Sequence, residues 1–586
     1  MPESLHEKPP RAWNRPARPP TPQTKGGPTR APTLSGQAPN PPALDLTAAS
    51  PRARSNPERG GAGEASLSRR APSALFVVLV AFVIYNANFR VIHTGDSVPA
   101  RLLPFALLRD HTLYLDGWVK PYLNPNGAPV YYLAESRGHE MSLYPLPLPL
   151  LITPLYVAPA WWLARHKPPI PMEGLAGFVI INTMEKLSAA LVAALSVGIL
   201  YLALLRIVSV RASLILAGLY AFGSTTWVIS SQSLWRQGLS ELALAGALWA
   251  LVRPAASRDY GFWVGLALAL AASNNVIYAI PALIFLVYFA RSERRNLLGY
   301  CLPLVVLGIA TIVYNWHFFH HLLGPYPSAV PESQVHRFGR GPEVHLPWWG
   351  GAVGLLASPN RGLLIFIPWT VFSIWGAARA LKRNTLGWEA YLVPSALGVY
   401  LVHAEYGEWW GGVCFGPRYL TDIVPFLVFF LVPVWPDLSA RKVLRGLFVL
   451  AAVVSVWVEV VGVFYYPNGQ WDWQPVPIVN DPRRIWDWRD TQIGRSWHAG
   501  PMPPLLLYDW LTIIRSGELS GEPPAPAHPP KAGLFRPSPL PPVVIPTSPR
   551  ASLPPFGRLA GPGTPFRCLF WPPRLPIIPV TARDEI

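Results

Sequence analysis

Charged residues are scarce in this sequence. Asp, Glu, Lys and Arg make up 14% of its 586 residues, whereas about a quarter of residues are charged in an ordinary soluble domain. By contrast, 51% of the residues are hydrophobic, and they are gathered into runs of about 20, the number that a helix needs to cross a bilayer. The composition therefore excludes a string of soluble domains and predicts an all-α polytopic membrane protein.

Cysteine is also scarce. The three cysteines, Cys301, Cys414 and Cys568, lie far apart and show no C-x-x-C spacing. We therefore infer neither a disulfide framework nor a structural zinc site.

The charges that are present are mostly positive, with a formal net charge of +17. Nucleic acid would be one partner for such a chain, but much of the excess lies in the N-terminal arm and in short segments between apolar runs. Short basic connectors mark the cytoplasmic side of membrane proteins. We interpret the charge as a topology signal and expect no nucleic-acid partner.

Both ends of the chain differ from its centre. Residues 1–73 are rich in Pro, Gly, Ser, Ala and Arg, and residues 517–586 are again dense in Pro without helical periodicity. Such segments bury too little apolar surface to fold. We expect a disordered cytoplasmic arm and a disordered tail. The arm is too long and too proline-rich for a secretory signal peptide, so the first apolar run is predicted to be an uncleaved span.

Residues 74–465 are predicted to form a bundle of about 11 transmembrane helices. The predicted spans cover residues 74–91, 184–205, 212–230, 238–252, two short helices within 261–290 that meet at polar residues 273–275, and then 297–317, 361–379, 388–403, 419–437 and 444–464.

The run 144–163 is long enough to cross the membrane but contains five prolines. If this run lies in the outer interface instead of crossing, all the short basic connectors face the cytoplasm together with the N-terminal arm. We therefore interpret it as an interfacial helix. The first external loop is then 92–183, and residues 466–516 form an external cap.

The external segments gather polar residues that could carry chemistry. Asp96 follows the first span, where a carboxylate could act as a general base or bind a cation, or could simply cap a helix. Glu140, next to His139, offers a second carboxylate for a base or metal role, or forms part of a polar helix start. His317, His320 and His321 have no nearby carboxylate in sequence, which disfavours a metal site there.

Two short turns offer cations at the outer mouth of the bundle. Trp235 and Arg236 could hold a phosphate or a sugar hydroxyl, or serve as an ordinary interfacial anchor with a snorkelling arginine. Arg361, within Ser358–Gly362, could fork two hydrogen bonds to phosphate, or mark a simple helix start. Both interpretations stay open at each turn.

The richest segment is 403–422. It combines the acids Glu405 and Glu408, a Trp409-Trp410 pair, glycines and an Arg418-Tyr419 pair at the mouth of the next span. An arginine in this position suits a lipid phosphate, and an aromatic belt would explain the tryptophans but not Arg418, so we favour a functional role. The later segments around Trp471-Asp472-Trp473 and residues 485–490 suit either sugar binding or a packed external cap, and we favour the cap.

Residues 74–500 resemble the GT-C superfamily of integral membrane glycosyltransferases, in particular the group around protein mannosyltransferases, aminoarabinose transferases and Rgt-type bacterial transferases. The resemblance rests on Gly95-Asp96-Ser97 with Arg101 following, on the Tyr144-Pro145 entry to the interfacial helix, and on Gly416-Pro417-Arg418-Tyr419-Leu420. It implies a GT-C-like bundle with extracytoplasmic loops, in the plasma membrane of a bacterium, with a cytoplasmic N-terminus.

The resemblance also implies an inverting transfer of a sugar from a polyprenyl-phosphate donor to a glycan, lipid or protein acceptor. Asp96 would be the base and Arg418 would hold the donor phosphate. Many relatives have two adjacent acids where this chain has Asp96-Ser97, so a second role would fall to Glu140 or Glu405, and the need for a divalent metal ion stays open. The expected catalytic residues are Asp96 and Glu140, the expected donor-phosphate residues are Arg418, Tyr419 and Arg361, and the expected substrate residues are Arg101, Tyr144, Trp235, Arg236, Glu405 and Trp409.

Two other functions stay open. A transporter or flippase of lipid-linked saccharides would carry polar or broken helices at mid-bilayer, whereas polarity in this sequence is concentrated at the external segments, which favours the enzyme. A non-catalytic scaffold subunit is the third interpretation.

Overall fold

A computed structural model describes residues 71–122, 130–167, 170, 172–253, 257, 259–325, 348–383 and 387–517. The arm up to residue 70, the tail from residue 518 and the loop segments 123–129 and 326–347 lie outside these ranges. The disorder expected for residues 1–73 and 517–586 therefore stays a prediction.

The described chain begins with an apolar helix, α2 (Ala74–Asn86). The Ser73 side chain caps it by accepting a hydrogen bond from the Phe76 amide, which satisfies one of the free donors of the first turn. No residue of α2 is charged. The helix ends at Asn86 rather than at residue 91, the end of the predicted span.

Between α2 and the main bundle, the chain forms short helices and one hairpin. These elements are η1 (Gly95–Ser97), α3 (Val98–Phe105), η2 (Ala106–Asp110), α4 (Asp116–Val119), η3 (Lys120–Tyr122), β1 (Leu133–Ser136), β2 (His139–Ser142) and α5 (Pro147–Arg165). β1 and β2 are antiparallel, with Glu135 opposite Glu140. Arg137 and Gly138 form the two-residue turn, both with positive φ, as a tight hairpin requires.

The first half of the bundle is built on one long helix, α6 (Leu175–Leu204), which contacts α2, α7 and α8. The helices that follow α6 are α7 (Val210–Phe222), α8 (Arg236–Leu251), α9 (Tyr260–Asn274), α10 (Ala279–Ser292) and α11 (Leu297–Phe319). α9 and α11 touch closely, because a Cβ at Gly261 or Gly265 would lie 2.2 Å from the carbonyl oxygen of Asn296 or Tyr300. Small residues allow such close backbone contact between membrane helices.

The second half of the described chain contains shorter helices. They are α14 (Trp348–Ala357), α15 (Leu363–Phe366), α16 (Thr370–Arg383), α17 (Trp388–Ala404), α18 (Val424–Phe429), α19 (Trp435–Ala440), α20 (Lys442–Val460), α21 (Gln470–Trp473), α22 (Gln492–Ala499) and α23 (Leu505–Ser516). α14 lies within residues 318–360, between the predicted spans 297–317 and 361–379.

Several described helices have the length and composition of membrane spans. Four segments are long and apolar enough to cross a bilayer: 147–165, 175–204, 294–319 and 442–465. The α11 segment is the least covered by the rest of the protein, and its exposed residues include Leu298, Val305 and Ile309. An apolar helix surface of this kind is stable in contact with lipid. The chain is thus a mostly helical membrane protein, while the count of about 11 spans stays a prediction.

Proline breaks two of the predicted spans. The span expected over 361–379 is divided into α15 and α16, with Pro368 in the interruption. The span expected over 419–437 is divided into α18, η8 (Val432–Val434) and α19, with Pro433 and Pro436 at the start of the later pieces. Proline lacks the amide hydrogen and clashes with the preceding turn, so neither segment forms one regular α-helix, although 424–440 stays helical throughout.

Two other predictions concern α9, α10 and α5. The break at Asn274-Asn275 is confirmed: α9 ends at Asn274, and the Asn275 side chain accepts a hydrogen bond from the Ile277 amide. α5 forms in spite of Pro154 and Pro159, and it meets the length and hydropathy of a span. Its interfacial placement therefore stays a prediction.

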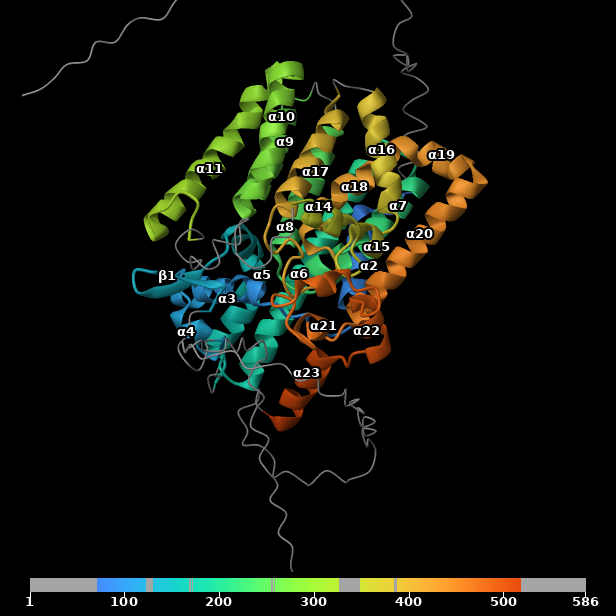
Figure 1. The fold of residues 1–586 in the computed structure, drawn as a ribbon. Helices are drawn as coiled ribbons and strands as arrows, with labels where there is room; N and C mark the ends of the chain where they lie inside the picture. The colour runs from blue at the N-terminus through green and yellow to red at the C-terminus, as the bar shows by residue number, and fades with distance from the viewer. Residues whose placement is uncertain are drawn as a thin grey trace, which may run out of the picture. The chain divides into compact units, whose positions relative to one another are not determined.

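Figure 1 shows that the short elements gather at one end of the bundle. There, α3, α4 and β1 lie near the same end as α21, α22 and α23, although they come from opposite ends of the described chain. α19, the first residues of α9 and the last residues of α10 lie at the opposite end of the bundle. The segments that carry most of the polar residues singled out in the sequence therefore share one side.

Candidate functional site

Asp96 and Arg418 meet at the end of the bundle that carries the short elements. The Arg418 Nη1 donates to Asp96 Oδ2 at 2.7 Å, although 322 positions separate the two residues. The Tyr144 hydroxyl donates to the other carboxylate oxygen, Oδ1, at 2.6 Å. Three segments, the first loop, the hairpin exit and the loop before α18, thus converge on one carboxylate.

Local backbone structure holds Asp96 in place. It lies in η1, where the Thr94 side chain accepts a hydrogen bond from the Asp96 amide. Gly95 leaves room for the neighbouring tyrosine, because a Cβ there would lie 2.3 Å from the Tyr131 hydroxyl oxygen. The Asp96 side chain remains 19% exposed, so it is fixed but accessible.

Arg418 is held between aromatic rings. Its guanidinium carbon lies 4.2 Å from the centre of the Trp235 ring and 5.1 Å from that of Tyr419, distances at which a cation is attracted to a ring face. Burial lowers the pKa of Arg418, but Asp96, Tyr419, Cys414 and Tyr144 together raise it by more, so the pKa lies above its usual value and the group stays charged. Its Nε is buried without a hydrogen-bond partner among the described residues.

The turn before α8 brings Trp235 and Arg236 to the same place. Trp235 is buried beneath Arg418, so it is not an exposed interfacial anchor. The Arg236 guanidinium carbon lies 5.2 Å from the centre of the Tyr144 ring. Tyr144 therefore contacts both the carboxylate of Asp96 and a second cation.

Tyr419 is the second aromatic residue close to the Arg418 guanidinium. Its ring stacks on His403, with centroids 4.6 Å apart and an angle of 9° between the planes. His403 is buried, and its Nδ1 has no hydrogen-bond partner among the described residues. We name the set Asp96, Tyr144, Trp235, Arg236, Arg418 and Tyr419 the Asp96 site.

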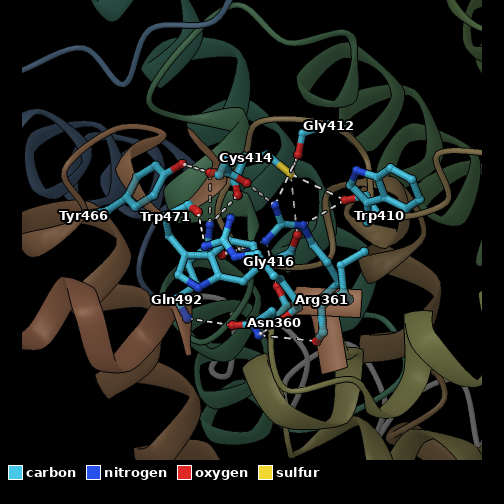
Figure 2. A network of polar contacts seen from close by, with 12 residues as sticks. Asn360, Arg361, Trp410, Gly412, Cys414, Gly416, Tyr466, Trp471 and Gln492 are labelled. Atoms are coloured by element: carbon cyan, nitrogen blue, oxygen red, sulfur yellow. Dashed lines mark hydrogen bonds and ion pairs between the residues drawn. The ribbon is translucent and has the colours of Figure 1, made fainter. Parts of the chain in front are cut away.

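Arg361 is not part of the Asp96 site. Figure 2 shows it inside a network of polar contacts, where it donates to the carbonyl oxygens of Asn360, Trp410 and Gly412 and to the Gln492 side chain. It also forms an ion pair with Asp472, and both side chains are fully buried. All five of its N–H donors are therefore used within the protein, and none remains for a donor phosphate.

Arg101 also lies in a separate buried pair. Its Nη1 donates to Glu185 Oε2 at 2.6 Å and lies 3.3 Å from His93 Nδ1. Burial and the charge of Arg101 lower the pKa of His93 to about 4. The Ser233 hydroxyl donates to Glu185 and lies 2.9 Å from the Ser97 hydroxyl oxygen. These contacts join η1 to the turn that carries Trp235, so Arg101 stabilises the Asp96 site through Glu185 and does not itself belong to it.

The remaining expected residues lie apart from Asp96. Glu140 is on β2, where its amide donates to Asp116 Oδ1 at 3.0 Å, and partial burial, Asp116 and Glu135 raise the pKa of its carboxyl. Glu405 is exposed just after α17.

Trp409 is likewise not an open platform for a sugar. It is buried, and its ring packs so tightly on α14 that a Cβ at Gly354 would lie 2.1 Å from it. Trp409 therefore secures the 404–418 loop against α14.

A metal site is not supported by the residues near Asp96. Within the described ranges, no group of three or more His, Cys, Asp or Glu side chains is arranged to hold a metal ion. In the part of the chain that the structure describes, the residues near Asp96 do not form a divalent-ion site, and no step proposed below passes through one.

Three residues in this region were not among those expected from the sequence: Tyr131, His403 and Gln492. Tyr131 packs on Gly95, and His403 stacks on Tyr419. Gln492 links Arg361 to the loop by donating to the Cys414 carbonyl oxygen and accepting from the Gly416 amide. A neutral Gln in a polar segment carries no sequence signal for this role. For His403 a signal was present, because it lies within the polar segment 403–422 that the sequence singled out.

Comparisons with known proteins identify no family. No family model matches the chain, and no curated protein matches it. Among solved structures, it resembles an oligosaccharyltransferase of Archaeoglobus fulgidus tethered with an acceptor peptide, with 15% identity and a TM-score of 0.41, over 70% of this chain and 58% of that chain. It also resembles the archaeal oligosaccharyltransferase AglB from Archaeoglobus fulgidus in complex with an inhibitory peptide and a dolichol-phosphate, with 13% identity and a TM-score of 0.38, over 67% and 55%.

This chain thus spans less than two thirds of the length of both structures. The overlap is too loose to indicate an activity for the protein.

Proposed function

We propose that the protein is a GT-C type glycosyltransferase that moves a sugar from a polyprenyl-phosphate donor to an acceptor at the extracytoplasmic face of the membrane. The observation that carries this proposal is the Asp96–Arg418 pair, in which a base and a phosphate-binding cation lie in direct contact. Its side chains are 19% and 10% exposed, whereas the ion pair of Arg361 and Asp472 is completely closed.

The chemistry follows from the positions of these two groups. Asp96 takes the proton of an acceptor hydroxyl, whose oxygen attacks the anomeric carbon of the donor sugar. The bond from that carbon to the phosphate oxygen breaks on the opposite face, which inverts the configuration. Negative charge grows on the leaving phosphate, and the Arg418 guanidinium stabilises it.

Arg418 can serve both groups because its guanidinium is a planar fork. Nη1 is used by Asp96, and the 10% of the Arg418 side chain that stays exposed is where a phosphate would contact it. Guanidinium and phosphate match well in such geometry. The Trp235 and Tyr419 rings contact the guanidinium and restrict its orientation. Arg236, beside Tyr144, adds positive charge for the phosphate or for sugar hydroxyls.

We propose other roles for the remaining residues that the sequence singled out. Arg361 and Trp409 act on the loop that carries Arg418, and Arg101 acts through Glu185. Glu140 and Glu405 have no described contact with Asp96, so we propose Asp96 as the single base.

A transporter of lipid-linked saccharides is the second candidate, because the structure buries acids inside helices. Glu241 on α8 and Glu459 on α20 are fully buried, and intramembrane acids often mark a translocation path. However, Glu241 is five residues from Arg236, which is about 7.5 Å along a helix. Glu241 therefore lies close to the Asp96 site. A translocation path would need acids further along the helix, towards the other side of the membrane, so the position of Glu241 favours the enzyme.

The proposal is tested by native mass spectrometry of the detergent-purified protein. The wild type is compared with Arg418→Ala and with the matched control Arg489→Ala, an exposed arginine at the same end. We expect a polyprenyl-phosphate sugar on the wild type and the control, and its loss from Arg418→Ala. Bulk phospholipid alone on all three proteins would overturn the proposal, and a bound donor that is moved across vesicles without sugar transfer would indicate the transporter.

A further inference from the structure

A second charged region lies at the other end of the bundle from the Asp96 site. There, α19 packs on α20 and is joined to α16 by the ion pair of Arg379 and Asp437, as the positions of these helices in Figure 1 allow. Between them lies an open cavity of about 340 Å³. The cavity is lined by Trp375, Ala378, Arg379, Lys382, Asp437 and Arg441.

Positive charge exceeds negative charge in this cavity. Arg379 forms an ion pair with Asp437, and Arg441 Nη2 lies 3.4 Å from the other oxygen of the same carboxylate. One carboxylate thus faces two arginines, and Lys382 adds a third cation one helical turn after Arg379. The cavity holds two positive charges more than it holds negative ones.

The surroundings of the cavity are apolar. On α16, Val371 and Ile374 are exposed, and on α20, Val443 and Leu447 are exposed. Exposed aliphatic surface on two helices that flank a charged cavity is typical of the boundary between acyl chains and headgroups. Trp375 is also exposed and lies 5.9 Å from the Arg379 guanidinium carbon, and tryptophan is enriched at this boundary.

We propose that this cavity binds the phosphate headgroup of an anionic phospholipid. Basic pockets between membrane helices on the cytoplasmic side recognise such headgroups, and the volume suits a small polar ligand. The predicted topology places the connectors 380–387 and 438–443 on the cytoplasmic side, so the lipid comes from the inner leaflet. The acyl chains lie along the exposed residues of α16 and α20, which commits the site to a lipid rather than to a soluble phosphate. The proposal does not depend on the chemistry at Asp96.

The test compares two double variants that remove the same charge. Lys382→Gln with Arg441→Gln changes two lining residues but keeps the Arg379–Asp437 pair. Lys442→Gln with Arg445→Gln removes two exposed cations of the adjoining first turn of α20 that do not line the cavity. The affinity of the full-length protein in detergent is measured for short-chain phosphatidylglycerol and phosphatidylcholine, with glycerol phosphate as the soluble competitor.

We expect the wild type to prefer phosphatidylglycerol, the lining variant to bind it about tenfold more weakly, and the control variant to bind it like the wild type. Thermal unfolding in detergent shows whether each variant is folded. Equal weakening in both variants, or no preference over phosphatidylcholine, would overturn the proposal. Competition by glycerol phosphate at the same concentration as the lipid would overturn the lipid as occupant.

Discussion

Arg361 and Asp472 form a completely buried ion pair that ties the region after α20 to the loop carrying Arg418. Asp472 also accepts a hydrogen bond from the Tyr466 hydroxyl at 3.0 Å. Arg361 in turn donates to the carbonyl oxygens of Trp410 and Gly412, only a few residues before Arg418. The pair therefore determines where the loop lies, and through it the position of Arg418.

Removing one partner of this pair is expected to destabilise the protein strongly. Asp472→Asn leaves the Arg361 charge buried without a counterion, which costs about 3–5 kcal/mol. Thermal unfolding in detergent measures the loss, with the exposed Asp487→Asn as a control. An unfolding temperature unchanged by Asp472→Asn would mean that the pair does not anchor the loop.

Asp96→Asn is expected to abolish sugar transfer without loss of folded protein. Asparagine keeps the size and can still accept a hydrogen bond from Arg418, but it cannot take a proton, and loss of a general base costs about 100-fold or more in rate. Turnover of a lipid-linked sugar is measured beside unfolding temperature, again with Asp487→Asn as the matched control. Wild-type activity in the Asp96→Asn protein would remove Asp96 from the mechanism.

Arg418→Lys distinguishes charge from geometry at the donor phosphate. Lysine keeps the positive charge but lacks the planar fork that serves Asp96 and a phosphate together. We expect it to retain more bound donor than Arg418→Ala but to transfer sugar at least about tenfold more slowly than the wild type. Rates and lipid retention are compared for all three proteins. Full activity in Arg418→Lys would show that only charge matters at this position.

His93 is expected to make the protein sensitive to acid. Its pKa of about 4 in the folded state lies below the value of about 6.5 in an unfolded chain. The unfolded state therefore binds more protons between these values, so this contribution to stability is complete above about pH 6.5 and is lost as the pH falls towards 4. Unfolding temperatures from pH 7.5 to 4.5 are compared for the wild type and His93→Gln, and equal acid sensitivity in both would contradict the prediction.

Much of the secondary structure follows from local sequence. Long apolar runs with few charges produce α2, α6, α11 and α20, because only a helix satisfies its backbone hydrogen bonds within an apolar environment. The break after α9 follows from Asn274-Asn275, whose side chains compete for backbone hydrogen bonds. The interruptions at Pro368 and Pro433 also have a local cause, the missing amide hydrogen of proline. Hydropathy predicted continuous spans there because it averages side-chain polarity over a window and does not register a missing backbone donor.

The arrangement of the candidate site was decided by tertiary structure. Asp96 and Arg418 were each recognisable from their sequence context, but their direct contact spans 322 positions and depends on how α6, α8 and the loop before α18 pack together. Arg361 and Arg418 look alike in sequence, since each follows a proline-containing turn before an apolar run. Only the fold buries the first against Asp472 and leaves the second accessible beside Asp96, because burial is set by neighbours that lie far away along the chain.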